Sequence, residues 1–205
     1  MSKVLVIGGG AAGMMAAITA AANGGEVLLL EKNEKLGKKL FITGKGRCNI
    51  TNAADTEDLF SAIVSNPKFL YSSFYSFTNS QVIDFFEGLG VKTKIERGGR
   101  VFPASDHSSD VIRALEREME QLGVEIYLQA EVKELILKEH VIKGVVLTSG
   151  KKLYADTVIV ATGGISYPST GSTGDGYRFA KACGHQVTEI LPSLVPMEVK
   201  EWYAK

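Results

Sequence analysis

The chain has 205 residues, of which 45% are hydrophobic and 22% are charged, and its 23 basic side chains balance its 23 acidic ones. This composition is typical of a globular protein with one large domain or two small ones, and it excludes a disordered tail. The neutral balance provides no basic excess for nucleic acid or for an anionic membrane surface. We therefore expect neither of these partners.

The cysteines and histidines predict neither disulfides nor a metal site. Cys48 and Cys183 lie far apart without a C-x-x-C spacing, and the three histidines are scattered. The uncharged run from Val4 to Gly25 superficially resembles a signal peptide, but the glycines at 8–10 divide it into a strand, a turn and a helix. We expect a cytoplasmic protein with free thiols.

The first thirty residues predict a βαβ unit. Lys3–Ile7 is a short apolar run that ends at glycine, which is typical of a strand buried on both faces. Small residues over 11–23 favour a helix packed closely on a sheet, and glycines follow it before the apolar strand Val27–Leu30. Such a unit pairs its strands in parallel through a right-handed crossover.

Further along the chain, the patterns predict more helices and strands around this unit. Residues 32–52 have no clear period and predict a long loop. Helices are expected over 56–65, 67–76, 80–89 (capped by Ser80), 109–122 and 174–183, and strands over 92–96, 100–102, 124–128, 132–137, 141–147, 153–154 and 158–161. The predicted fold is a Rossmann-like α/β domain with a central parallel sheet, helices on both faces and a small antiparallel meander.

A Gly-x-Gly-x-x-Gly pattern lies where the first strand meets the first helix. In that context the pattern predicts a dinucleotide site. Gly8 permits the tight turn, Gly10 lets the backbone approach a pyrophosphate, and Gly13 lets the helix lie close to the strand. The free N–H groups of the helix terminus then face the phosphates.

An acidic residue follows the second strand at the spacing that a nucleotide ribose requires. Glu31 lies 18 positions after Gly13, where a carboxylate accepts hydrogen bonds from ribose hydroxyls and repels a 2′-phosphate. The adjacent Lys32 weakens that repulsion. A neutral adenosine ribose is therefore favoured over a phosphorylated one.

NAD and FAD share this fingerprint, so other segments must distinguish the two cofactors. Tyr177 and Lys181 form the Tyr-x-x-x-Lys pair of short-chain dehydrogenases, but the glycine spacing differs from that of those enzymes. Three segments favour FAD: the Gly/Lys-rich stretch 37–52, the end of a buried strand at 161–164, and the Thr-Gly-Asp-Gly helix start at 173–176.

With these segments the chain resembles the BaiN/YhiN-like family of FAD-dependent flavoproteins, often described as NAD(P)/FAD-dependent or aminoacetone-oxidase-like oxidoreductases. Lys45 occupies a position where we expect glycine from that family. The matching segments are 8–13, 44–52 (Gly-Lys-Gly-Arg-Cys-Asn-Ile-Thr-Asn), 100–103, 161–164, 171–177 and 192–196.

The resemblance implies an extended FAD. Its pyrophosphate would lie on Gly10, Ala11, Ala12 and Gly13, and its ribose on Glu31, with Lys32 beside it. The flavin or ribityl region would approach Gly46, Arg47 and Cys48, the adenine edge would meet the backbone of Val132, Thr162 and Gly163 would border the cofactor, and Asp175 would accept a hydrogen bond. Cys48 is either a packed residue or a redox-reactive thiol, and packing is the favoured interpretation.

The resemblance also implies a domain division and a function. Residues 1–190 would form the N-terminal portion of an FAD-binding domain, and 191–205 an exit strand towards a substrate domain. That domain would be absent or truncated in this chain, and the C-terminal part of the fold would be missing as well. The expected function is a flavoprotein oxidoreductase that transfers hydride through flavin N5 between an acceptor and an organic substrate or NAD(P)H. The alternatives are an NAD-dependent dehydrogenase and a non-catalytic FAD-binding fragment. The sequence identifies no catalytic residue.

Overall fold

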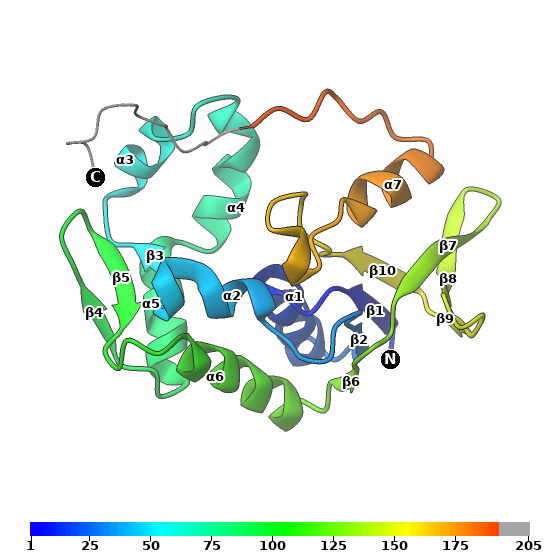
Figure 1. The fold of residues 1–205 in the computed structure, drawn as a ribbon, viewed down its shortest axis with the longest axis horizontal. Coiled ribbons are helices and arrows are strands. Elements are labelled where there is room, and N and C mark those ends of the chain that lie inside the picture. The colour runs from blue at the N-terminus through cyan, green and yellow to red at the C-terminus, as the bar shows by residue number, and fades with distance from the viewer. Residues whose placement is uncertain (193–205) are drawn as a thin grey trace, which may run out of the picture.

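A four-stranded parallel sheet forms the centre of the fold (Figure 1). The structure, a computed structural model, describes residues 1–192. The strands lie in the spatial order β10-β1-β2-β6, and the register places Ile7 between Leu30 and Val160. The strands are β1 (Lys3–Ile7), β2 (Glu26–Leu30), β6 (Glu125–Tyr127) and β10 (Thr157–Val160).

Two helices cover one face of this sheet. Helix α1 (Ala11–Ala22) and helix α6 (Ser108–Gln121) pack beside each other over Val6 and Leu29. Helix α6 contributes an apolar stripe that includes the fully buried Leu115, while its charged residues face outward. Burial of each such side chain contributes about 1.5–3 kcal/mol, so this face carries much of the stability.

The antiparallel meander covers the other face, together with one helix. Leu5 and Leu28 point to this side and share a core cluster with Val145 and with Phe179. The meander consists of β7 (Val132–Lys138), β8 (Val141–Leu147) and β9 (Lys152–Tyr154), and the helix is α7 (Asp175–Ala182). Both faces of the central strands β1 and β2 are therefore buried, which explains their nearly unbroken apolar sequences. The edge strand β10 is predicted to be buried as well, but it is only partly covered, and Thr157 and Val160 are exposed.

The remaining elements gather on the side of the molecule opposite β7–β9 (Figure 1). They include a second antiparallel sheet in the order β3-β5-β4. The elements are α2 (Lys38–Ile42), η1 (Thr43–Gly46), β3 (Thr51–Asn52), α3 (Thr56–Ser61), η2 (Pro67–Leu70), α4 (Tyr71–Ser76), α5 (Asn79–Gly88), β4 (Thr93–Ile95) and β5 (Arg100–Pro103); η3 (Pro168–Thr170) lies in the loop before α7.

The structure confirms the predicted fold class and most elements, with four differences. The helix expected over 56–65 is shorter, since α3 ends at Ser61. The 32–52 segment contains α2, a short helix that is too brief to show a period. The helix expected over 67–76 is divided into η2 and α4, because Leu70 departs from regular helical geometry between them. Helix α5 is capped by Thr78 rather than Ser80, since Thr78 forms a reciprocal capping box with Gln81.

Two predictions concern the chain as a whole. Within residues 1–192, no helix combines the length and apolar character needed to span a bilayer. The expected exit strand 191–205 lies almost entirely outside the described residues, so its prediction stands untested.

Candidate functional site

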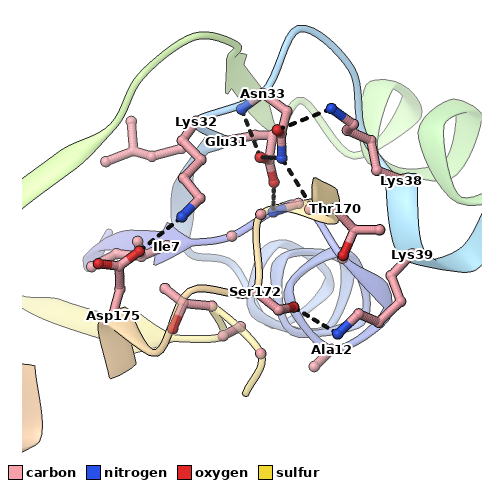
Figure 2. A pocket seen from close by; sticks show the side chains of 18 of the residues that line it. Ile7, Ala12, Glu31, Lys32, Asn33, Lys38, Lys39, Thr170, Ser172 and Asp175 are labelled. Atoms are coloured by element: carbon pink, nitrogen blue, oxygen red, sulfur yellow. Dashed lines mark hydrogen bonds and ion pairs between the residues drawn. The ribbon is translucent and has the colours of Figure 1, made fainter. Parts of the chain in front are cut away.

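A cavity of about 290 Å³ lies at the carboxyl ends of β1, β2 and β10. Parallel strands of a doubly wound sheet bind their ligands at this edge, where successive loops diverge. Figure 2 shows the side chains that surround the cavity. Its walls are formed by 7–12, 30–33, 38–40, 43, 130–132, 161–163, 170–172, 175 and 179.

The glycines of the fingerprint have distinct geometric roles. Gly8 has a φ of +109°, and a Cβ there would lie 2.5 Å from the carbonyl oxygen of Ala161. A Cβ on Gly13 would overlap the carbonyl oxygen of Gly8, so this glycine permits the close approach of helix and strand rather than lining the cavity. Gly10 lines the cavity, and a Cβ there would meet nothing within 4 Å. The cavity is thus open at Gly10.

The N-terminus of α1 presents free hydrogen-bond donors to this cavity. Helix α1 has no side-chain cap and no acidic residue in its first turn. Among residues 1–192, no acceptor receives the backbone N–H groups of Gly10, Ala11 or Ala12. The helix dipole adds partial positive charge here, so the terminus is suited to bind an anion.

Glu31 is buried at the end of β2 and is held by three N–H donors. Its Oε2 accepts from the backbone N–H of Gly9 at 2.6 Å, and its Oε1 accepts from the backbone and side-chain N–H groups of Asn33 at 2.8 and 2.6 Å. A carboxylate has about four acceptor positions. One position on Oε2 therefore remains for a ligand hydroxyl, as predicted for a ribose.

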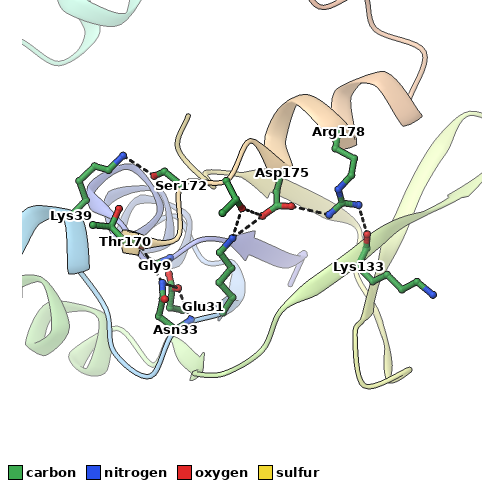
Figure 3. A network of polar contacts seen from close by, with 11 residues as sticks. Gly9, Glu31, Asn33, Lys39, Lys133, Thr170, Ser172, Asp175 and Arg178 are labelled. Carbon is green, nitrogen blue, oxygen red and sulfur yellow. Dashed lines mark hydrogen bonds and ion pairs between the residues drawn. The ribbon is translucent and has the colours of Figure 1, made fainter. Parts of the chain in front are cut away.

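Lys32 forms an ion pair across the cavity with Asp175 (Figure 2), and Asp175 also accepts a hydrogen bond from Arg178 (Figure 3). The Nζ of Lys32 lies 2.9 Å from Asp175 Oδ2 and 2.7 Å from Thr173 Oγ1. Burial raises the pKa of Asp175, but hydrogen bonds from Lys32, Arg178 and Thr173 outweigh that effect and lower it to about 2. Both predicted residues line the cavity, with their charges mutually compensated.

The loop between β10 and α7 is fastened over the cavity by side chains from 32–39. Asn33 Nδ2 donates to the carbonyl oxygen of Thr170 at 3.2 Å. Lys39 Nζ donates to the carbonyl oxygen of Ser166 and to Ser172 Oγ, both at 2.7 Å. Together with the Lys32–Thr173 bond, these contacts join segments more than 120 positions apart in sequence.

Thr162 has a buried hydroxyl that lacks a partner. It follows β10 and lines the cavity beside Gly163. Within the described chain, its Oγ1 is buried without a hydrogen bond. A buried polar atom in this state costs about 1–3 kcal/mol unless a ligand or water satisfies it.

Besides Gly13, three predicted residues lie outside the cavity wall. Arg47 stacks on the Phe102 ring at 4.1 Å and pairs with Glu96 at 2.8 Å and Asp106 at 3.4 Å. Its charge is therefore neutralised by carboxylates that lie next to sheet β3-β5-β4 rather than in the cavity. Cys48 is packed in the core, and burial raises the pKa of its thiol. Gly46 is also absent from the wall.

The remaining predicted residues meet at the cavity, and others join them. Gly8, Gly10, Ala11, Ala12, Glu31, Lys32, Val132, Thr162, Gly163 and Asp175 all contribute to its wall. Asn33, Lys39 and Ser172 also line the cavity, although no sequence pattern gave these three residues individual roles. The sequence signal for these residues was the Lys-rich start of the 32–52 segment. Its connection to the cavity is visible only in the folded chain, where α2 lies beside the 164–174 loop.

These features fit a bound FAD. An FAD molecule has a diphosphate for the free donors of α1, a ribose for the open position on Glu31 and polar groups for the orphaned Thr162 hydroxyl. The open face at Gly10 leaves space for the diphosphate to approach the backbone. A metal is not needed for this fit, and no cluster of three metal-ligating side chains occurs in the part of the chain that the structure describes.

Comparison with known proteins places this geometry in a family. Residues 2–192 match the family described as HI0933-like protein Rossmann domain. The chain is 39% identical over 177 residues to the 3-dehydro-bile acid delta(4,6)-reductase of Clostridium scindens, covering 86% of the chain and 42% of that protein. It is 30% identical over 202 residues to the ribosomal RNA dihydrouridine synthase of Haemophilus influenzae, covering 98% and 50% respectively.

A solved structure has the same fold. The structure of a flavocytochrome c3 fumarate reductase in its open conformation superimposes with a TM-score of 0.63 over 89% of this chain and 40% of that one, at 21% identity. This likeness shows the fold alone. The chain spans about half the length of the curated relatives that it matches. On its sequence, fold and cavity, the chain is an FAD-binding Rossmann domain and belongs to the HI0933-like family.

Proposed function

We propose that the chain forms the FAD-binding part of a flavin-dependent reductase that acts on an organic substrate. The observation that carries the proposal is the cavity at the end of β1 and β2, where the uncapped α1 terminus and the buried Glu31 lie together. An anion site and a hydroxyl acceptor in one cavity match the diphosphate and the ribose of an ADP group.

The wall of the cavity suggests how the cofactor lies. Glu31 would hold the adenosine ribose, and the backbone of Val132 would border the adenine. The free N–H groups of Ala11 and Ala12 would bind the diphosphate. The remainder of the cofactor would continue past α2 and Thr43.

The reaction class is supported by the two curated relatives. One is named as a delta(4,6)-reductase and the other as a dihydrouridine synthase, and both names describe addition of hydrogen to a carbon–carbon double bond. When bound, FAD would supply hydride transfer through N5. We propose that a hydride and a proton are added across such a bond while NAD(P)H is oxidised to NAD(P)⁺. This chain's residues would bind and orient the cofactor and exclude water from it.

Location and macromolecular partners also belong to the proposal. Cys48 and Cys183 are both free thiols, which supports a cytoplasmic protein. One relative is named for ribosomal RNA, whereas the neutral charge balance of this chain favours a small-molecule substrate. The expectation that nucleic acid is not bound stays a prediction.

A single methyl group tests the cofactor site. Gly10→Ala is compatible with the fold, because the backbone φ of −84° suits alanine and a Cβ there meets no protein atom within 4 Å. The methyl group would occupy the space through which a diphosphate approaches. We expect wild-type protein to bind FAD at one equivalent by fluorescence titration, and the variant to bind at least about 10-fold more weakly, equivalent to about 1.4 kcal/mol.

Gly88→Ala is the matched control. Gly88 lies in α5, and a Cβ there also meets no atom within 4 Å. This variant should bind FAD as the wild type does. Wild-type protein that takes up no FAD would contradict the cofactor assignment. Air oxidation of NADH by the loaded protein, measured at 340 nm, tests the redox role separately.

A further inference from the structure

Lys39 lies in α2 with its ammonium group at the wall of the cavity (Figure 2). Its Nζ donates to two neutral oxygens, the carbonyl of Ser166 and Oγ of Ser172, both at 2.7 Å. Ser172 is itself buried. A lysine ammonium has three donors, so one N–H remains after these two bonds.

The charge of Lys39 is not compensated by the described residues. The neighbouring lysines of the wall both have carboxylate partners, since Lys32 pairs with Asp175 at 2.9 Å and Lys38 with Glu34 at 3.4 Å. Among residues 1–192, no carboxylate lies within ion-pair distance of Lys39. A half-buried cation without a counterion favours an anionic ligand, because a partly dry site strengthens the attraction.

The free end of α1 contributes to the same wall. Ala11 and Ala12 carry unpaired backbone N–H groups there, and the positive end of the helix dipole adds to the charge of Lys39. We propose that Lys39 binds the diphosphate of the cofactor directly, opposite the N-terminus of α1. This inference rests on the proposed function and adds a residue to it.

The two bonds of Lys39 also give it a positioning effect. They hold the 164–174 loop against α2, so the same ammonium would contact the loop and the phosphate together. Loss of the charge would then weaken diphosphate binding specifically. A purely structural role would instead weaken binding of every ligand in the cavity, including one without phosphate.

ADP and adenosine distinguish these roles. We expect Lys39→Met to reduce the affinity for ADP by at least about 10-fold, as a charge-assisted hydrogen bond is lost, and to change the affinity for adenosine by less than about 2-fold. Both ligands are measured by competition with FAD. Lys35→Met is the matched control. This substitution removes the same charge, but Lys35 is exposed and lies outside the cavity wall. It should change neither affinity.

A second measurement, made on the wild-type chain, tests the same role of Lys39. ADP should protect Lys39, but not Lys35, from acetylation by acetic anhydride, as read by mass spectrometry, and adenosine should give no protection. Equal losses of ADP and adenosine affinity in Lys39→Met, or absence of ADP protection, would overturn the inference while leaving FAD binding intact. A wild-type chain that binds neither FAD nor ADP would overturn both proposals.

Discussion

The carboxylate of Glu31 accepts the backbone N–H of Gly9 at 2.6 Å and thereby connects the end of β2 to the turn that follows β1. The same carboxylate is expected to hold the ribose. Its structural and binding roles are therefore linked. A substitution that preserves the volume of the side chain should reveal both roles.

Glu31→Gln should destabilise the fold and weaken cofactor binding. Glutamine offers one acceptor oxygen in place of two, so its amide group would face either Gly9 or Asn33, both of which are donors. A buried donor left without an acceptor costs about 1–3 kcal/mol. Urea unfolding should show this loss, whereas Glu26→Gln at an exposed position should change the free energy of unfolding by less than about 0.5 kcal/mol.

Asp175 should make stability depend on pH in the acid range. Hydrogen bonds and the charge of Lys32 lower its pKa from 3.8 to about 2 in the folded protein. A depressed pKa contributes stability that is present above the unfolded value and lost as pH falls through the folded value. The contribution of about 2 kcal/mol should therefore be complete at pH 6 and should vanish between about pH 4 and pH 2.

Asp175→Asn isolates that effect. The difference in unfolding free energy between wild type and variant should shrink as the pH is lowered from 6 to 2. Asp84→Asn, at an exposed position of α5, should show no such trend. A difference that stays constant across this range would show that the carboxylate charge is not what stabilises the folded state.

Lys45→Gly should stabilise the protein. Lys45 has a φ of +59°, a left-handed conformation that costs a residue with a Cβ about 1–2 kcal/mol. Glycine avoids this cost, but its greater conformational freedom in the unfolded chain lowers the free energy of unfolding by about 0.5–1 kcal/mol. We expect a net gain of about 0.5–1 kcal/mol in the free energy of unfolding, and a decrease in stability would contradict this interpretation.

Cys48 should be unreactive in the folded protein. It is only 1% exposed, and burial raises its pKa, so little thiolate is available for attack. One thiol, Cys183, should react promptly with Ellman's reagent at pH 8, and the second only after unfolding in guanidinium. In a Cys183→Ser variant, prompt release of one equivalent of chromophore from the native protein would instead favour a reactive Cys48.

The sequence predicted the parts of the site that depend on local backbone chemistry. Gly8 and Gly13 follow from the contact between strand and helix, and Glu31 follows from the length of the βαβ unit. Short-range patterns also located most strands, because β1 and β2 are short, buried apolar runs. These features need only neighbouring residues to be recognised.

The remainder of the site depends on contacts between distant segments. Whether Arg47 faces the cavity or the carboxylates of Glu96 and Asp106 is decided by how β4 and β5 pack against the 43–48 segment, which no local pattern encodes. Likewise, Lys39 gains a role only because the 164–174 loop folds back onto α2. Sequence spacing alone cannot assign either side chain.

The strand order β10-β1-β2-β6 has a consequence for how the protein matures. The cavity joins residues from Ile7 to Phe179, and β10 is the neighbour of β1 although it is synthesised after the other three of these four strands. The fingerprint glycines therefore emerge from the ribosome long before the opposite wall. Cofactor capture should follow the synthesis of α7, and bound FAD should then stabilise the domain as a whole by mass action.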